Sequence, residues 1–219
     1  MVWVALLVFA FLAGSVPFGL LIARAKGVDI RAQGSGNIGA TNVGRVLGRR
    51  FGFLCFGLDA LKGAVPVLVA GGVTGLLGRQ LADMAPTDGW LWLAVGVSAL
   101  LGHMFSPWIG FKGGKGVATG FGALVAMWTP LTIPSLIALG VWVVFVKLLR
   151  MVSIASILAA LSIPISVAVR AILSVEPEEA LRASHPALVV TAAIALLVVW
   201  KHRANIGRAL RGEELKVKV

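Results

Sequence analysis

The stretch that decides the fold is "MVWVALLVFAFLAGSVPFGLLIA", residues 1–23, which contains no charged side chain. A helix needs about 20 consecutive apolar residues to cross the hydrocarbon core of a bilayer. The stretch therefore predicts a membrane-spanning helix. No Lys or Arg stands ahead of it, so it lacks the basic start of a secretory signal, and we expect it to be retained.

The composition of the whole chain agrees with this first stretch. Hydrophobic residues make up 58% of the 219 residues, charged residues make up 13%, and the mean hydropathy is +0.95. Soluble domains have about 45–50% apolar and about 25% charged residues, so we expect an all-α integral membrane protein. The single cysteine excludes an internal disulfide and any multi-cysteine metal site.

Seven apolar runs are long enough to be considered as spans. They predict a seven-transmembrane helix bundle that forms a single domain over residues 1–219. The fourth and seventh runs are short, and "WTPLTIP" (residues 128–134) is also consistent with a break in one long element. The runs cover residues 1–23, 52–77, 89–105, 116–129, 131–149, 152–173 and 186–200.

The charged residues predict the orientation. Of the 20 Lys and Arg residues, 16 fall in residues 24–50, in "FKGGKG" (residues 111–116), at Lys147 and Arg150, or in the tail from Lys201. Because positive loops stay on the cytoplasmic side, we expect an external N-terminus and a cytoplasmic C-terminus. The net charge of +11 is then explained by helix ends that face anionic lipid, with no nucleic-acid partner.

Three glycine-rich or basic segments fall on this cytoplasmic side. They are "GSGNIGATNVGR" (residues 34–45), "GHMFSPWIGFKGGKGVATG" (residues 102–120) and "WKHRANIGRALRGEE" (residues 200–214). Flexible backbone N–H groups and fixed cations suit an anion such as phosphate. "KGGKG" also leads into an apolar run, where the positive end of a helix adds to the same site. The alternative is a basic turn that holds the topology and binds lipid head groups.

Other phosphate and metal motifs do not fit. "GSGNIG" (residues 34–39) matches the dinucleotide fingerprint but follows a predicted membrane helix, where the fingerprint requires a strand. "GGKG" has Gly116 where a nucleotide-binding loop needs Ser or Thr for magnesium. No His is followed five positions later by Asp, as in the H-x4-D acyltransferases. The cytoplasmic acids are too few to hold magnesium, so we expect no metal and no cofactor; they are Asp29, Glu213 and Glu214.

Two groups of polar residues are candidates for chemistry. His202 and Asn205 are three positions apart and would share a helical face. Together with Ser35, Arg45 and Lys115, they could position a phosphate ester that carries a hydroxyl group. A tail that merely anchors the last span is the alternative for the first two residues.

Asp59 and Lys62 lie inside the second apolar run, where ions are costly and call for an explanation. They form either a structural pair or a support for the loop that carries Arg45. His103, at the end of the third run, is either a structural hydrogen bonder or part of the same support.

Taken together, the three segments resemble the signature motifs of the bacterial membrane glycerol-3-phosphate acyltransferases that use acyl phosphate, the PlsY family. The family patterns are approximately "GSGNxGATNxxR", "GHxFxxFxxFKGGKGVAT" and "HRENIxRLLxGxE", and the resemblance covers nearly the whole chain. This chain departs from them at Trp108, Ala204 and Gly207. Ala204 replaces a glutamate of the third pattern, which leaves open only what that glutamate does.

The resemblance implies transfer of a fatty acyl group from acyl phosphate to the 1-hydroxyl of sn-glycerol 3-phosphate. The products are lysophosphatidic acid and inorganic phosphate, the first step of bacterial phospholipid synthesis. The site is expected on the cytoplasmic side of a multi-pass protein in the bacterial inner membrane. The soluble enzyme that makes acyl phosphate is a candidate partner.

The resemblance also implies roles for individual residues. The proton acceptor is either His202 or the departing phosphate of the donor, and the resemblance favours the second, with His202 orienting glycerol phosphate. Asp59, Lys62 and His103 would support the site from behind. The residues expected to act on glycerol phosphate are Ser35, Arg45, Lys115, His202 and Asn205, and those expected to bind phosphate or shape its loops are Asn37, Gly39, Thr41, Asn42, Lys112, Gly113, Gly114, Gly116, Thr119 and Arg208.

Two other functions are compatible with the composition. A phosphate or organophosphate transporter would place substrate contacts at the bilayer midplane and show repeated halves. Only Asp59 and Lys62 lie at that depth, and the sequence shows no convincing internal repeat. A purely structural lipid-binding protein would turn over no acyl donor.

Overall fold

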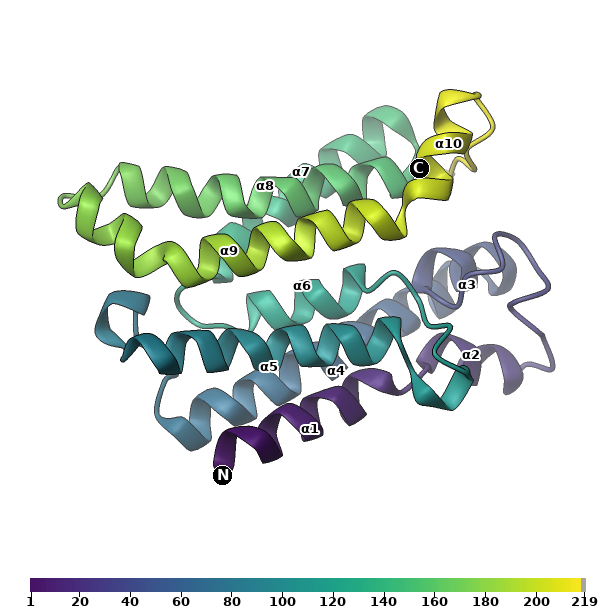
Figure 1. Ribbon diagram of the computed structural model, residues 1–219. Helices are drawn as coiled ribbons and strands as arrows, with labels where there is room; N and C mark the ends of the chain where they lie inside the picture. Colours follow the sequence, from purple (N-terminus) through teal and green to yellow (C-terminus); the bar gives the residue numbers. More distant parts are fainter. Residues whose placement is uncertain (218–219) are drawn as a thin grey trace. The chain divides into compact units, whose positions relative to one another are not determined.

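The computed structural model describes residues 1–217, whose regular elements are all helices; these residues contain no β-strand. The prediction of an all-α protein is therefore confirmed for this part of the chain. The helices group into two compact units (Figure 1). Unit 1 comprises Met1–Val73 and Ala94–Ala126, and unit 2 comprises Thr74–Leu93 and the chain from Met127 onward. The prediction of one domain over the whole chain stays a prediction.

Unit 1 holds the first two glycine-rich segments. The segment of residues 34–45 forms a loop that leads into α3, and the segment of residues 102–120 connects α5 to α6. The helices that frame these loops are α1 (Val2–Ser15), α2 (Phe18–Arg24), α3 (Ala40–Leu47), α4 (Arg49–Thr74), the later part of α5 (Pro86–Met104), the 3-10 turn η2 (Pro107–Ile109) and α6 (Val117–Val125).

Unit 2 holds the third segment. Its long helices pack in chain order, with α8 (Val152–Ile172) against both α7 (Thr132–Leu149) and α9 (Pro177–Lys201), as Figure 1 shows. The short helix α10 (Arg203–Leu210) follows α9 after a break at His202 and also contacts α8. The 3-10 turn η1 (Leu81–Asp83) contacts α9.

Six helical segments are long and apolar enough to cross a membrane in the part of the chain that the structure describes. They are Val2–Arg24, Arg49–Thr74, Thr87–Ile109, Thr132–Leu149, Val152–Ile172 and Pro177–Lys201. The predicted fourth run, residues 116–129, forms only α6, whose nine residues span about 14 Å at 1.5 Å per residue. The count of seven spans and the external N-terminus stay predictions.

The last span starts earlier than the sequence predicts. The apolar run begins at residue 186, but α9 begins at Pro177. Pro177 occupies the first turn, where its missing N–H has no intrahelical partner to lose. Glu178 and Glu179 lie in the same turn, where their negative charges stabilise the positive end of the helix dipole. An apolar count misses this turn because it is polar.

Glycine brings the helices of unit 1 into backbone contact. A Cβ atom on Gly14 of α1 would overlap the carbonyl oxygen of Ala99 in α5, and one on Gly63 of α4 would overlap that of Thr119 in α6. Neighbouring helices in a membrane gain little from hydrophobic burial, so close packing through small residues is a main source of their association. These contacts fix α5 and α6, the two helices that carry the second glycine-rich segment.

Candidate active site

The first glycine-rich loop is held from inside by Asn42. The side chain is 1% exposed, and its Oδ1 accepts the N–H of Ser35 at 2.8 Å. Its Nδ2 donates to the carbonyl oxygens of Ile30 at 3.2 Å and Gln33 at 3.0 Å. One buried amide thus satisfies three backbone groups of residues 30–35. The structure places Asn42 beneath the loop as a brace, and its predicted contribution to phosphate binding stays a prediction.

Several other residues of the first loop and of α3 carry exposed polar side chains. Asn37 accepts the N–H of Gly39 at 2.9 Å, which shapes the entry into α3. Arg45 lies in the last turn of α3, and the side chains of Ser35, Thr41 and Arg45 are exposed. The underside of the loop is a buried apolar cluster, made of Leu20, Ala23, Ile30, Ile38, Val43 and Cys55. The loop therefore offers a hydroxyl and a guanidinium from a rigid base.

The second segment folds back onto the end of α5. The N–H of Gly114 donates to the carbonyl oxygen of His103, and that of Gly113 to Met104, both at 3.2 Å. A Cβ on Gly113 would overlap the carbonyl oxygen of His103, and one on Gly114 would overlap its imidazole. These two N–H groups bind carbonyl oxygens of the protein, whereas the sequence predicts that they bind phosphate. The role of Gly113 and Gly114 in phosphate binding stays a prediction. The structure shows that both glycines pack closely against the end of α5.

The anion-binding capacity of this segment lies at the start of α6. Gly116 precedes the helix with φ 79, a left-handed conformation that glycine adopts without strain. The first helical bond runs from Gly120 to Gly116, so the N–H groups of the first turn have no intrahelical acceptor. The hydroxyl of Thr119 is fully buried and has no hydrogen-bond partner within residues 1–217. Lys112 is exposed and Lys115 is partly buried.

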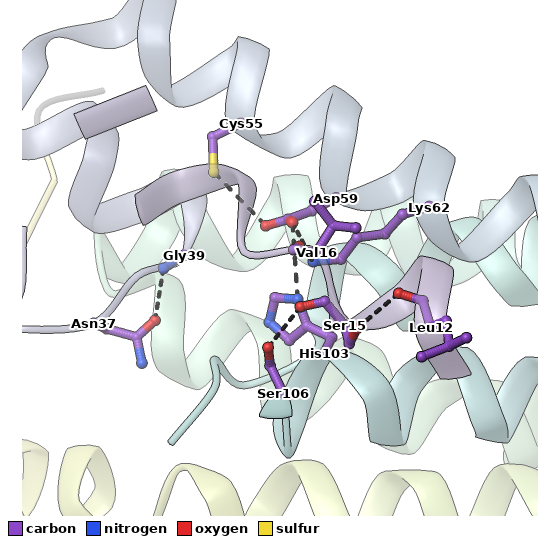
Figure 2. Close-up of polar contacts among 10 residues, drawn as sticks. All are labelled: Leu12, Ser15, Val16, Asn37, Gly39, Cys55, Asp59, Lys62, His103 and Ser106. Carbon is purple, nitrogen blue, oxygen red and sulfur yellow. Dashed lines mark hydrogen bonds and ion pairs between the residues drawn. The ribbon is translucent and has the colours of Figure 1, made fainter. Parts of the chain in front are cut away.

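Beneath the second segment, the two intramembrane ions form the pair that their spacing predicts. Lys62 Nζ lies 2.8 Å from Asp59 Oδ1 and donates to the carbonyl oxygen of Val16 at 2.6 Å (Figure 2). His103 Nδ1 lies 3.8 Å from the same carboxylate oxygen, and Cys55 Sγ lies 3.7 Å from Asp59 Oδ2. The pair therefore faces His103 and the second segment. Its predicted support of the loop that carries Arg45 stays a prediction.

The third segment places a buried imidazole at the end of α9. His202 is 2% exposed, and its Nδ1 lies 2.8 Å from the carbonyl oxygen of Val198. A carbonyl oxygen can only accept, so we infer that Nδ1 carries the proton. In the neutral ring Nε2 then holds the lone pair.

Glu214 organises the rest of the third segment, and sequence reasoning missed it. Its Oε1 accepts from Asn205 Nδ2 at 2.6 Å and from Ser153 Oγ at 2.7 Å, and its Oε2 accepts from Arg208 Nε at 2.9 Å. The residue is 9% exposed. The family pattern ends in "GxE" and so contains this glutamate, but the sequence alone suggests only a magnesium ligand.

The surroundings of Glu214 set its charge state. Burial raises the pKa of its carboxyl group, but the hydrogen bonds from Asn205 and Ser153 and the charge of Arg208 outweigh burial and hold that pKa below its usual value. The carboxylate is thus ionised at neutral pH and orients two of the residues that the sequence analysis assigned to the substrates. No group of three His, Cys, Asp or Glu side chains that could hold a metal ion occurs within the described residues.

Comparison with known proteins agrees with these three segments. A family profile described as glycerol-3-phosphate acyltransferase matches residues 4–212. The chain belongs to the glycerol-3-phosphate acyltransferase family. It is 46% identical over 210 residues to the glycerol-3-phosphate acyltransferase of Geobacter sulfurreducens, covering 95% of this chain and 94% of that protein. The corresponding protein of Aquifex aeolicus is 40% identical over 211 residues, 95% of this chain and 96% of its own length.

Solved structures extend the likeness to the fold. The chain is similar to PlsY (YgiH), an integral membrane glycerol 3-phosphate acyltransferase, in its glycerol 3-phosphate form, with a TM-score of 0.82 and 38% identity. The match to its lysophosphatidic acid form has a TM-score of 0.80 and 37% identity. Each match covers 100% of this chain and 96% of the solved chain. The resemblance found in the sequence is confirmed: the chain is a multi-pass membrane protein and a member of an acyltransferase family.

Proposed function

We propose that this chain transfers a fatty acyl group from acyl phosphate to the 1-hydroxyl of sn-glycerol 3-phosphate, releasing lysophosphatidic acid and inorganic phosphate. Family membership over residues 4–212 is the observation that carries the proposal. The relative's structures in glycerol 3-phosphate and lysophosphatidic acid forms support the acceptor and the product. The donor rests on the resemblance of "FKGGKGVAT" (residues 111–119) to the family pattern. In a bacterium this reaction would begin phospholipid synthesis.

The reaction needs cations more than it needs a strong nucleophile. Each substrate carries a phosphate with close to two negative charges at neutral pH, so the site must bring together two anions that repel. Acyl phosphate is a mixed anhydride with a good leaving group. Positioning alone can then supply about 7–11 kcal/mol of the barrier. We assign the charge balance to Arg45, Lys112, Lys115 and Arg208.

The step itself is a displacement at the acyl carbon. The 1-hydroxyl oxygen bonds to that carbon, the bond from the carbon to the phosphate oxygen breaks, and phosphate departs with the bonding electrons. The hydroxyl proton passes to an oxygen of the departing phosphate. His202 would accept a hydrogen bond from glycerol phosphate at Nε2, consistent with Nδ1 donating to Val198. Ser35, Lys115 and Asn205 would hold the phosphate of glycerol phosphate.

The expected location is the bacterial inner membrane with the reacting groups on the cytoplasmic side. The charge distribution of the loops supports this assignment. A soluble enzyme that makes acyl phosphate would then deliver the donor from the same compartment. The charged pair Asp59 and Lys62 is engaged within the protein, so it gives no support to a transport pathway.

The donor and the acceptor can be tested together. Purified protein in detergent is given glycerol phosphate with either acyl phosphate or acyl-coenzyme A, and lysophosphatidic acid is measured. We expect product with acyl phosphate only, and a loss of about 100-fold or more for Lys115→Ala, because removing one preorganised donor to a reacting anion costs on the order of 10²–10³-fold. Product from acyl-coenzyme A alone would reject the proposed donor. Uptake of glycerol phosphate into sealed vesicles without a donor would favour transport.

A second experiment distinguishes the two proton acceptors. His202→Gln keeps a hydrogen-bonding side chain but removes the base. If the donor phosphate takes the proton, the variant keeps most of its kcat and needs more glycerol phosphate to reach it. If the imidazole is the obligatory base, kcat falls by about 10²- to 10⁴-fold. Steady-state kinetics at saturating acyl phosphate gives the answer.

A further inference from the structure

The first membrane span is broken where it meets the second glycine-rich segment. α1 ends at Ser15 and α2 begins at Phe18, with Val16 extended and Pro17 unable to donate a hydrogen bond. Such a break leaves carbonyl groups without helical donors. In a bilayer no water satisfies them, so the protein must supply the donors itself.

Three side chains converge on this break. Ser106 Oγ donates to the carbonyl oxygen of Ser15 at 2.7 Å, and Trp108 Nε1 donates to the hydroxyl of Ser15 at 2.7 Å. Lys62 Nζ donates to the carbonyl oxygen of Val16 at 2.6 Å. Figure 2 shows Ser106, Ser15 and Lys62 around the broken end. Ser15 and Ser106 are both buried, so the bond between them is shielded from water.

The same donors belong to the segment that leads into "KGGKG". Ser106 directly precedes η2, and its carbonyl oxygen accepts the N–H of Phe111 at 2.9 Å. Two residues later, the N–H groups of Gly113 and Gly114 bind the end of α5. The turn of residues 103–114 is therefore closed at its base and attached at Ser106 to the break in the first span.

Lys62 reaches the same turn from the other side. Its carboxylate partner Asp59 faces the ring of His103, and that ring packs against Gly114 so closely that a Cβ there would overlap it. The cation, the carboxylate and the imidazole thus form a line from Val16 to Gly114. A movement of the broken end would be transmitted along it to the glycine-rich turn.

We propose that Ser106 and Lys62 are positioning residues that use the break in the first span to hold the turn of residues 103–114 in the geometry needed for a phosphate-bearing substrate. The expected change in KM rests on the proposed function. The attachment of the turn to the break does not depend on that function. Neither residue touches substrate in this account; each acts through the turn. The intramembrane charges therefore serve the geometry of the loop.

Ser98 provides a matched control. Its hydroxyl donates to the carbonyl oxygen of Leu7 at 2.8 Å, so it also joins α5 to α1 by a serine-to-carbonyl bond. It lies in the middle of α5, away from the break and from the glycine-rich turn. Ser98→Ala and Ser106→Ala remove the same kind of bond. Only Ser106→Ala loosens the attachment of the turn of residues 103–114 to the break in the first span, which we call the anchor.

The two serine variants are compared in purified detergent-solubilised protein. Hydrogen exchange of the peptides covering residues 105–116 is measured by mass spectrometry, together with melting temperature, kcat and both KM values. We expect Ser106→Ala to raise exchange in these peptides and to raise KM for a phosphate substrate by about 10- to 100-fold, since small misplacements have effects of this size. Ser98→Ala should lower the melting temperature comparably, with exchange and KM unchanged.

Lys62 is tested without leaving a buried charge unpaired. Lys62→Met alone leaves the buried carboxylate of Asp59 without its cation, and the variant can fail to fold for that reason. Lys62→Met with Asp59→Asn removes both charges together. We expect the double variant to melt at a higher temperature than Lys62→Met alone. Hydrogen exchange in residues 105–116 should stay above that of the wild-type protein.

The outcomes separate the two proposals. The proposal that Ser106 and Lys62 hold the turn would be overturned by equal exchange in Ser106→Ala and Ser98→Ala. It would also be overturned by wild-type exchange and KM values in the double variant. If the wild-type protein makes no lysophosphatidic acid from acyl phosphate, the proposed function fails, and the exchange comparison still decides whether the anchor exists.

Discussion

The two units of this protein hold their polar residues by different physical means. In unit 1 the first loop is braced by the uncharged amide of Asn42, and the second is held by close packing of glycine against α5. In unit 2 the corresponding residues are held by one ionised carboxylate, Glu214, which binds Asn205 and Arg208. An amide keeps its hydrogen bonds at any pH, whereas a carboxylate loses its charge in acid. The first loop of unit 1 and the third segment, in unit 2, should therefore respond differently to mutation and to pH.

The largest difference is expected when the central acceptor of unit 2 is removed. Glu214→Gln keeps the shape but leaves Arg208 without its partner and offers one fewer acceptor oxygen. Breaking a buried ion pair costs about 3–5 kcal/mol, of which a third-exposed Arg208 side chain recovers a part through water. We expect a lower melting temperature and loss of most activity, measured by thermal unfolding in detergent and product formation.

The neighbouring residue is the control for this substitution. Glu213 pairs with Arg211, but both side chains are more than half exposed. Glu213→Gln removes the same charge from the same turn and should change neither quantity. Equal effects of the two substitutions would show that the net charge of the tail matters and the buried contacts do not.

A smaller effect is expected when the brace of unit 1 is removed. Asn42→Ala leaves the N–H of Ser35 and two carbonyl groups without their partner, and an unsatisfied buried polar group costs about 1–3 kcal/mol. We expect KM for glycerol phosphate to rise together with hydrogen exchange of residues 30–45. Asn37→Ala, which removes one partly buried bond to Gly39, should have a weaker effect.

The smallest expected effect is a dependence on pH that arises from Glu214 of unit 2. The pKa of Glu214 is lower in the folded protein than its ordinary value of 4.5, so the folded state binds fewer protons than the unfolded state between the two pKa values. The stabilisation by Glu214 is thus fully present above the ordinary value and is lost as pH falls through the folded-state pKa.

Melting curves between neutral pH and pH values below 4.5 test this dependence. The wild-type protein should lose more stability on acidification than Glu214→Gln, and the two curves should approach each other at low pH. Asn42→Ala should keep the acid dependence of the wild-type protein. Parallel curves for the wild type and Glu214→Gln would mean that the carboxylate is not the group that titrates.

The sequence predicted the membrane class and the three polar segments because these depend on local composition. The long uncharged runs are sufficient for the spans, and the glycines beside Lys112 and Lys115 mark the second segment without any knowledge of contacts. The spacing of Asp59 and Lys62 gave their pairing as one of two alternatives, and the structure shows this pair. Each of these features is decided within a few residues of the chain.

The contacts over long sequence separations could not be predicted in this way. Lys62 binds the carbonyl of Val16, 46 positions away, and Ser106 binds that of Ser15, 91 positions away. Ser153 meets Glu214 across 61 positions. The N–H groups of Gly113 and Gly114 were assigned to phosphate because a glycine-rich string does not reveal whether its donors face a ligand or the end of the preceding helix.

The contact between Ser153 and Glu214 also sets an order of events during synthesis. At roughly 5–20 residues per second, a ribosome needs about 3–12 s to make the 61 residues between them. Throughout that interval α8 exists without the carboxylate that later joins it to the third segment. Asn205 and Arg208 receive their partner only after nine and six further residues, respectively. The polar end of unit 2 thus assembles only after the loops of unit 1 have been synthesised.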